Sequence, residues 1–264
     1  MLESAFATWQ WLMSPISGAS VHVVDFGTSW HARLMVLGWA ILLPVGILLV
    51  RFYKVTPGQD WPRRLDNPFW FRSHRAFEYA AGVLMLAALA LILFASPANS
   101  PWGRFHAYAG WTLVIFGWIQ LLGSHLRGTM GGPVEPFTRN RRPPEQWRGD
   151  HFDMSRKRVV FEYVHKILGY GLLALSVLTL LSGLAAADAL RWMWIVIAAW
   201  WLAMAAVFAL LQRQGRALDC YQAIWGVDPD LPGNQRQPIG WGIRRYTPET
   251  LARAPWPRRP SAGN

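Results

Sequence analysis

Five apolar runs, each about as long as a membrane-spanning helix, constrain the fold of this chain more than any other feature. An α-helix rises about 1.5 Å per residue, so roughly 20 apolar residues cross the hydrocarbon core of a bilayer. Polar segments rich in Pro, Gly and Arg separate the runs. The sequence therefore predicts an all-α, multi-pass membrane helical bundle with five transmembrane helices, at residues 31–50, 74–95, 105–123, 159–184 and 190–211.

The segments on either side of this bundle have different compositions. Residues 1–30 contain no Lys or Arg, and Phe6, Trp9 and Trp11 before Pro15 predict a short interfacial helix. The N-terminus lacks the basic start and small-residue cleavage site of a signal peptide, so we expect it to stay in the mature protein. Residues 31–211 form the predicted membrane domain, in which we expect Pro44 to kink the first helix. Residues 212–264 predict a polar, basic tail with too little apolar periodicity for a second domain.

The distribution of basic residues predicts how the bundle is oriented. Of the 26 Lys and Arg, six lie in residues 51–75, eight in residues 124–158 and eight in residues 212–264. All three segments fall on one side of a five-helix bundle, so the positive-inside rule places the N-terminus outside and the tail in the cytoplasm, as in a bacterial inner membrane. Because the net charge of +11 belongs to loops between spans, and 17 Trp suit membrane interfaces, nucleic-acid binding is excluded.

A single cysteine, Cys220, limits the cofactors that the chain can hold. It excludes a disulfide within the chain, an iron–sulfur cluster on four thiolates and covalent haem attachment through C-x-x-C-H. Any cofactor must be bound by other side chains.

Four of the seven histidines lie near the N-terminal ends of four successive predicted spans. Successive helices alternate in direction, so His31 and His106 share one depth near the outer face, and His74 and His165 share a depth near the cytoplasmic face. Two imidazoles at one depth on different helices are what bis-histidine ligation of a b-type haem requires. The pattern predicts two haem b groups in a core of four helices, with His31 and His106 ligating the outer iron and His74 and His165 the inner one.

Two further features fit haem at these positions. Gly110 follows His106 by four residues and Gly169 follows His165 by four, so each pair shares a helix face where a missing side chain would let a porphyrin approach the backbone. Cations that lie close in sequence to the histidines are candidates for pairing with the haem propionates. They are Arg33, Arg72, Arg75, Arg104, Arg158 and Lys166.

Each of these features also has an ordinary structural explanation. A lone interfacial histidine is more often a packing or hydrogen-bonding residue, flanking arginines anchor topology, and H-x-x-x-G spacing permits close helix packing. Glu78 and Glu162 are expected to form interfacial ion pairs rather than to couple protons. The loop histidines, His22, His125 and His151, are expected to be solvated, although the latter two are also candidates for a cytoplasmic donor site.

The first four spans resemble the transmembrane domain of the cytochrome b561 family. The most specific matches are HARLMVLGW from His31 and HKILG from His165, with the segments that begin at Ser73 and Phe105 also matching. The resemblance implies a helical bundle with two b haems, in which the first histidine pairs with the third and the second with the fourth. Animal and plant members have six spans and use ascorbate, whereas this chain has five predicted spans and no DOMON-like module. The layout resembles a stand-alone bacterial member, and ascorbate specificity is not carried over.

These observations predict an oxidoreductase-type electron carrier in a lipid membrane. It would pass electrons between a reductant, such as a quinol or a cytoplasmic small molecule, and an acceptor on the other face, such as a periplasmic electron carrier. The alternative is a haem-containing anchor or accessory subunit of a larger respiratory or photosynthetic complex, for which the histidine-free fifth span and the tail offer contact surface. A homodimer and a haem-free scaffold also stay open.

Overall fold

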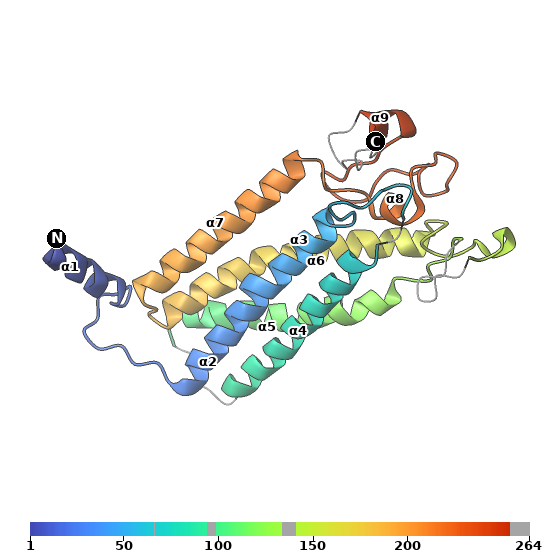
Figure 1. Ribbon diagram of the computed structural model, residues 1–264. Coiled ribbons are helices and arrows are strands. Elements are labelled where there is room, and N and C mark those ends of the chain that lie inside the picture. The colour runs from blue at the N-terminus through green and yellow to red at the C-terminus, as the bar shows by residue number, and fades with distance from the viewer. Residues whose placement is uncertain (66, 94–98, 134–140, 254–264) are drawn as a thin grey trace. The chain divides into compact units, whose positions relative to one another are not determined.

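The described part of the chain is built from helices (Figure 1). The computed structural model describes residues 1–65, 67–93, 99–133 and 141–253, and these residues contain isolated β-bridges but no β-strand. The helices, in order, are α1 Leu2–Leu12, α2 Phe26–Met35, the π-helix η1 Val36–Leu42, α3 Leu43–Phe52, α4 Phe69–Ile92, α5 Pro101–Gly123, η2 Ser124–Leu126, η3 Pro144–Gln146, α6 Arg156–Ala186, α7 Arg191–Arg213, α8 Cys220–Trp225 and α9 Pro248–Ala252.

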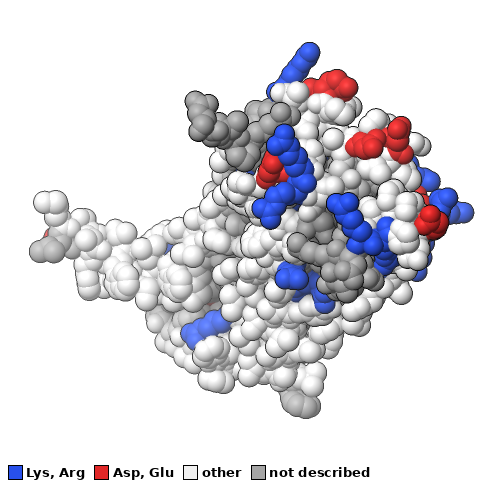
Figure 2. Space-filling view, turned by 45° about the vertical axis from the view of Figure 1, so that its right-hand side comes forward, with Lys and Arg blue, Asp and Glu red and all other residues white. Residues whose placement is uncertain are grey.

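Five helical segments are long and apolar enough to cross a membrane, which confirms the predicted number and class of elements. They are Phe26–Phe52, Phe69–Ile92, Pro101–Leu126, Arg156–Ala186 and Arg191–Arg213. In Figure 2, charged side chains gather on one part of the visible surface, and much of the rest carries no charge. The predicted end of the second span, near residue 95, falls outside the described residues, as do Arg139, Arg258 and Arg259 of the basic segments.

The first span begins five residues earlier than predicted because of a capping interaction. Asp25 precedes α2 in an extended conformation, and its carboxylate accepts a hydrogen bond of 3.0 Å from the backbone N–H of Thr28. This bond satisfies one of the donors that a helix start leaves unpaired. The helix therefore begins at Phe26, within a stretch that is too polar to be assigned to a span by hydropathy alone.

The chain divides into two compact units, and each spanning segment contributes to both. The first unit comprises Met1–Pro44, Phe77–Ile119 and Tyr170–Val207, and the second comprises Val45–Ala76, Gln120–Gly169 and Phe208–Asn264. His31 and His106 belong to the first unit, and His74 and His165 belong to the second. The two histidine pairs predicted from depth thus fall into different units.

In the first unit, a π-helical segment precedes Pro44. Proline has no backbone N–H and its ring clashes with the carbonyl four residues earlier, so regular α-helical bonding fails at this point. The seven-residue π-helix η1 occupies it. The carbonyl of Ala40, which Pro44 cannot pair, instead accepts a hydrogen bond of 2.6 Å from the indole Nε1 of Trp200 on α7.

The predicted interfacial helix at the N-terminus is present as α1, also in the first unit. Its aromatic side chains are exposed, including Phe6 and Trp9. The Arg191 guanidinium at the start of α7 stacks on the indole of Trp11, with its central carbon 5.2 Å from the ring centroid. The backbone N–H of Ser17 donates to the carboxylate of Asp188 at 3.0 Å. These contacts attach the segment after α1 to the α6–α7 turn.

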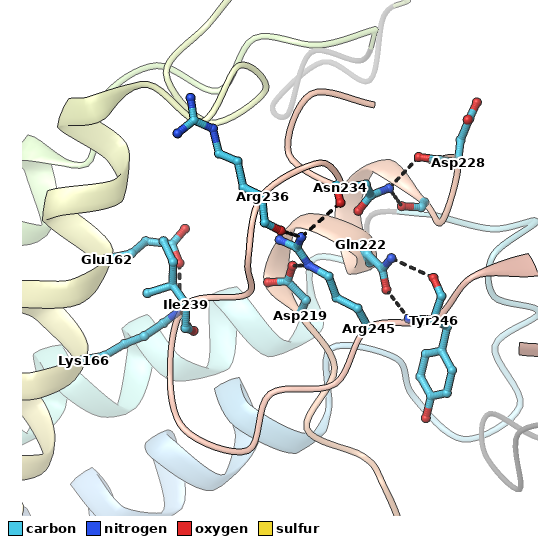
Figure 3. A network of polar contacts seen from close by, with 11 residues as sticks. Glu162, Lys166, Asp219, Gln222, Asp228, Asn234, Arg236, Ile239, Arg245 and Tyr246 are labelled. Atoms are coloured by element: carbon cyan, nitrogen blue, oxygen red, sulfur yellow. Dashed lines mark hydrogen bonds and ion pairs between the residues drawn. The ribbon is translucent and has the colours of Figure 1, made fainter. Parts of the chain in front are cut away.

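In the second unit, the C-terminal segment differs from the expected polar tail. Leu218 and Tyr221 are almost completely buried, and the indole Nε1 of Trp61 donates to the backbone carbonyl of Gln222 at 3.3 Å. A network of polar contacts continues through the segment (Figure 3). In it the side chain of Gln222 bonds the backbone N–H and carbonyl of Tyr246 at 2.8 and 2.9 Å. Residues 214–253 therefore fold against the loop that follows α3.

Candidate functional site

The first predicted pair, His31 and His106, comes together in the first unit. His31 lies on α2 and His106 on α5, and their ring centroids are 6.1 Å apart with an angle of 82° between the ring planes. His31 is buried, with 9% of its surface exposed. Two imidazoles from different spanning helices therefore lie close together.

Backbone carbonyls orient both rings of this pair. The Nδ1 atom of His31 lies 3.0 Å from the carbonyl oxygen of Ala88 on α4, and Nδ1 of His106 lies 2.9 Å from that of Thr179 on α6. A carbonyl oxygen can only accept, so each Nδ1 carries the proton and donates it. Each Nε2 is then left with a lone pair, which is the form in which histidine binds a metal.

The second predicted pair, His74 and His165, comes together in the second unit. His74 lies on α4 and His165 on α6, with ring centroids 6.4 Å apart and ring planes at 90°. The ring of His165 stacks on Phe161, one turn earlier, at 5.3 Å and 22°. The backbone of Gly46 contacts the ring of His74 by a hydrogen bond. The two histidines of each predicted pair thus lie close together in the structure.

The two predicted glycine gaps differ. A side chain at Gly110 would meet nothing within 4 Å, so the space beside α5 is open there. At Gly169 a Cβ would lie 3.1 Å from Nε2 of Gln120. That amide reaches across to donate a hydrogen bond of 2.6 Å to the backbone carbonyl of His165. Gly110 therefore leaves room for a bound group, whereas Gly169 accommodates a side chain of α5.

Sequence reasoning missed a third glycine, Gly183, on α6. A Cβ at Gly183 would lie only 2.8 Å from Cε1 and Nδ1 of His106, so only glycine lets the imidazole occupy this place. Thr179, whose carbonyl holds the same ring, lies one turn earlier on the same face. The spacing of Thr179 and Gly183 in the fourth span was visible in the sequence, but nothing there linked it to a histidine on another helix.

The predicted propionate partners fall into two groups. Arg158 and Lys166 already share a carboxylate: Arg158 Nε lies 2.9 Å and Lys166 Nζ 2.7 Å from the two oxygens of Glu162. The interfacial ion pair expected for Glu162 with Arg158 is therefore present. The other four cations are exposed, with Arg33 stacked on Trp30 at 5.1 Å and Arg75 on Phe71 at 5.7 Å. Arg72 and Arg104 are the other two exposed cations.

Outside the spans, His151 is buried rather than solvated as expected. It is fully enclosed between Tyr221 and Trp225, with ring centroids at 5.8 and 6.1 Å, and neither ring nitrogen has a hydrogen-bond partner within the described residues. Burial lowers the pKa of His151 to about 3, so the ring stays neutral. Burial likewise lowers the pKa of Lys54 to about 8 and raises that of the Cys220 thiol to about 11.

The five spans and the two facing imidazole pairs define an integral membrane protein of the helical-bundle class, with histidine side chains as its candidate ligands. Comparison with curated proteins identifies relatives of the chain. The chain is 26% identical over 155 residues to a cytochrome b561, DM13 and DOMON domain-containing protein of Arabidopsis thaliana, which covers 58% of this chain and 14% of the relative. A second Arabidopsis thaliana protein, a cytochrome b561 and DOMON domain-containing protein, is 27% identical over 139 residues, or 53% of this chain and 30% of the relative.

A third relative comes from an animal. Ferric-chelate reductase 1 of Bos taurus is 28% identical over 105 residues, which cover 39% of this chain and 17% of the reductase. The chain thus spans less than a third of each of these relatives. No protein-family model matches the chain. No solved structure matches it either. Together these matches show that the chain is related to the cytochrome b561 family.

The family relationship implies haem b, and the geometry of each histidine pair fits it. Two imidazoles held close together on different helices are the donor set that would hold a haem b. The observed separations are 6.1 and 6.4 Å. The Nδ1–carbonyl bonds of His31 and His106 are the outer contacts that metal-bound histidines usually make. The donor sets present therefore suit a haem iron between each pair.

Proposed function

We propose that the chain is a di-haem b-type cytochrome that transfers electrons across a membrane. The observation that carries the proposal is the approach of two imidazole pairs, His31 with His106 and His74 with His165, at 6.1 and 6.4 Å. Bound haem would supply one redox centre that accepts and releases single electrons at each pair. The relationship to cytochrome b561 proteins supports the same activity.

The residues around the pairs would bind and orient the two groups. Hydrogen bonds from Nδ1 to Ala88 and Thr179 hold His31 and His106 in the tautomer that leaves Nε2 available. The open space at Gly110 suits a flat ring beside α5. We assign the propionates to exposed cations, Arg33 and Arg104 for the first pair and Arg72 and Arg75 for the second, because Arg158 and Lys166 already pair with Glu162.

We further propose that the protein lies in a bacterial inner membrane with its N-terminus outside and its C-terminal segment in the cytoplasm. The support is the concentration of Lys and Arg in residues 51–75, 124–158 and 212–264, which alternate with segments nearly free of cations. The first histidine pair would then be the outer one and the second pair the cytoplasmic one.

The donor and acceptor are proposed by class. A quinol or a cytoplasmic small molecule would reduce the protein, and an outer-face acceptor, such as a periplasmic electron carrier, would oxidise it. Because one relative is named a ferric-chelate reductase, a chelated ferric ion is a further acceptor to test.

Reconstituted vesicles test the proposed transfer directly. Protein loaded with haem is inserted into vesicles that contain a trapped reductant, and external acceptors, including ferricyanide and a ferric chelate, are added. We expect the acceptors to be reduced only in vesicles that contain the protein. Reduction at the rate of protein-free vesicles would contradict the proposal.

A second function is favoured by one observation on α7. This helix lacks histidine, and few residues of its most apolar stretch are buried within the chain, which leaves exposed apolar side chains such as Leu202 and Leu210 for a partner. The chain would then be a haem-containing anchor of a larger membrane complex or half of a homodimer. A stoichiometric partner that co-purifies from native membranes would support this function, whereas a monodisperse chain that transfers electrons alone would contradict it.

A further inference from the structure

A cavity of about 290 Å³ lies in the second unit, between the start of α6 and the loop before residue 240. It is lined by Met154, Val159, Tyr163, Arg236, Gln237 and Ile239. Met154 and Ile239 are 3% and 4% exposed, so the floor of the cavity is apolar. The polar groups, a guanidinium, an amide and a phenol, belong to side chains that are exposed and form its rim.

The cavity adjoins a face of α6 that is suited to lipid. Val160, Tyr163, Val164 and Ile167 follow the i, i+3, i+4, i+7 spacing of one helix face and are 53%, 46%, 57% and 70% exposed. Because α6 is one of the five spans, exposed apolar side chains on it meet lipid rather than water. Tyr163 belongs both to this face and to the cavity, so the cavity opens beside the acyl region.

The guanidinium of Arg236 is unpaired within the described part of the chain. Its backbone carbonyl accepts a hydrogen bond from Arg245, which also bonds the carbonyl of Asn234 and pairs with Asp219. Those contacts hold the loop, while the Arg236 side chain is directed away from the network (Figure 3). A fixed backbone thus presents a free cation to the cavity.

We propose that this cavity binds the phosphate headgroup of an anionic phospholipid, with an acyl chain along the α6 face. Guanidinium groups bind phosphate through paired, charge-assisted hydrogen bonds, and Gln237 and Tyr163 add neutral donors at the rim. A quinol is the other membrane-dissolved candidate, but its oxidation releases protons. None of the described residues that line the cavity is a carboxylate or an imidazole that would accept one. The site is independent of haem and of the proposed electron transfer.

Native mass spectrometry of the purified protein in detergent tests the proposal. Phosphatidylglycerol is added as the anionic lipid and phosphatidylcholine as the zwitterionic one, and lipid-bound chains are counted. We expect one tightly bound phosphatidylglycerol per chain, and occupancy at least about fivefold lower in Arg236→Gln. Arg213→Gln removes the same charge from an exposed residue at the end of α7 and should bind as the wild type does.

Two further measurements test whether the bound phosphate belongs to a lipid or to a soluble molecule, and whether the shape of the cavity matters as well as its charge. Glycerol 3-phosphate is added as a soluble competitor, and displacement of the lipid by it at equal concentration would assign the site to a soluble phosphate instead. Val159→Phe narrows the cavity without changing charge and should also lower phosphatidylglycerol occupancy. Equal binding of the two lipids, or equal occupancy in wild type and Arg236→Gln, would overturn the proposal.

Discussion

The imidazole of His106 is positioned by two residues of a single neighbouring helix. The backbone carbonyl of Thr179 accepts a hydrogen bond of 2.9 Å from its Nδ1, and Gly183 leaves the space that the ring occupies. Both lie on one face of α6, so a change at either residue acts on the ring without removing the ligand itself. Variants at these two positions can therefore show the effect of misplacing the His106 ring while the ring itself is still present.

Replacing Gly183 by valine is expected to lower the haem content by up to one per chain. The first carbon of the new side chain would lie 2.8 Å from two atoms of the His106 ring, which is closer than van der Waals contact allows, so the ring must move. Haem per chain is measured by pyridine haemochrome absorbance. Gly171→Val on the same helix is the control, because nothing lies within 4 Å of that position. Equal loss in both variants would show a general effect on α6.

The buried imidazole of His151 makes stability depend on pH. The pKa of His151 is about 3 in the folded protein against about 6.5 for an unfolded chain, because burial disfavours its charged form and Arg158 and Arg127 add repulsion. Between these values the unfolded state binds more protons, so stability is full above pH 6.5 and falls as pH drops toward 3, by up to about 1.4 kcal/mol per pH unit.

Replacing His151 by leucine should remove that contribution. The apparent melting temperature of the wild type in detergent should fall more between pH 7 and pH 5 than that of His151→Leu. His22→Leu, at a histidine near the surface of the N-terminal segment, should keep the wild-type dependence. Parallel curves for wild type and His151→Leu would mean that the ring titrates normally and is not buried in solution.

At the scale of elements, the spans were predictable and their irregularities were not. Hydropathy and the bilayer thickness define five helices, and alternating direction places His31 with His106 and His74 with His165. The π-helix before Pro44 was not predictable, because it depends on Trp200 of a distant helix to pair the carbonyl of Ala40. The residues around Pro44 do not indicate that Trp200 will bond this carbonyl.

The C-terminal segment was mispredicted for a related reason. Its buried residues, such as Leu218 and Tyr221, form a nearly continuous run over residues 217–225, which shows neither a helical nor a strand period. They are buried by residues remote in sequence, including Trp61, which packs on Tyr246 with ring centroids at 6.2 Å. The same long-range packing encloses His151, whose loop sequence alone suggested a solvated side chain.

Removal of the Trp200 indole nitrogen tests the role assigned to it in the first span. Trp200→Phe leaves the Ala40 carbonyl beside Pro44 without its donor, and we expect a loss of about 0.5–2 kcal/mol of stability. Thermal denaturation in detergent would report it as a lower melting temperature. Trp201→Phe is the matched control, since the indole nitrogen of Trp201 has no partner among the described residues. An unchanged melting temperature for Trp200→Phe would contradict the role.

At the scale of the whole molecule, the two histidine pairs belong to two separate compact units, so each pair should bind its haem without the other. Single substitutions are therefore expected to be additive. This separation makes the count of haems per chain a direct readout of the proposed function.

The most direct measurement is the haem-to-chain ratio, with reduced-minus-oxidised spectra, of four proteins: wild type, His106→Ala, His74→Ala and the double variant. We predict ratios of two, one, one and zero, with each single variant losing a different spectral component. A wild-type ratio of one or zero, or an unchanged spectrum in His106→Ala, would contradict the account of two bis-histidine haem sites.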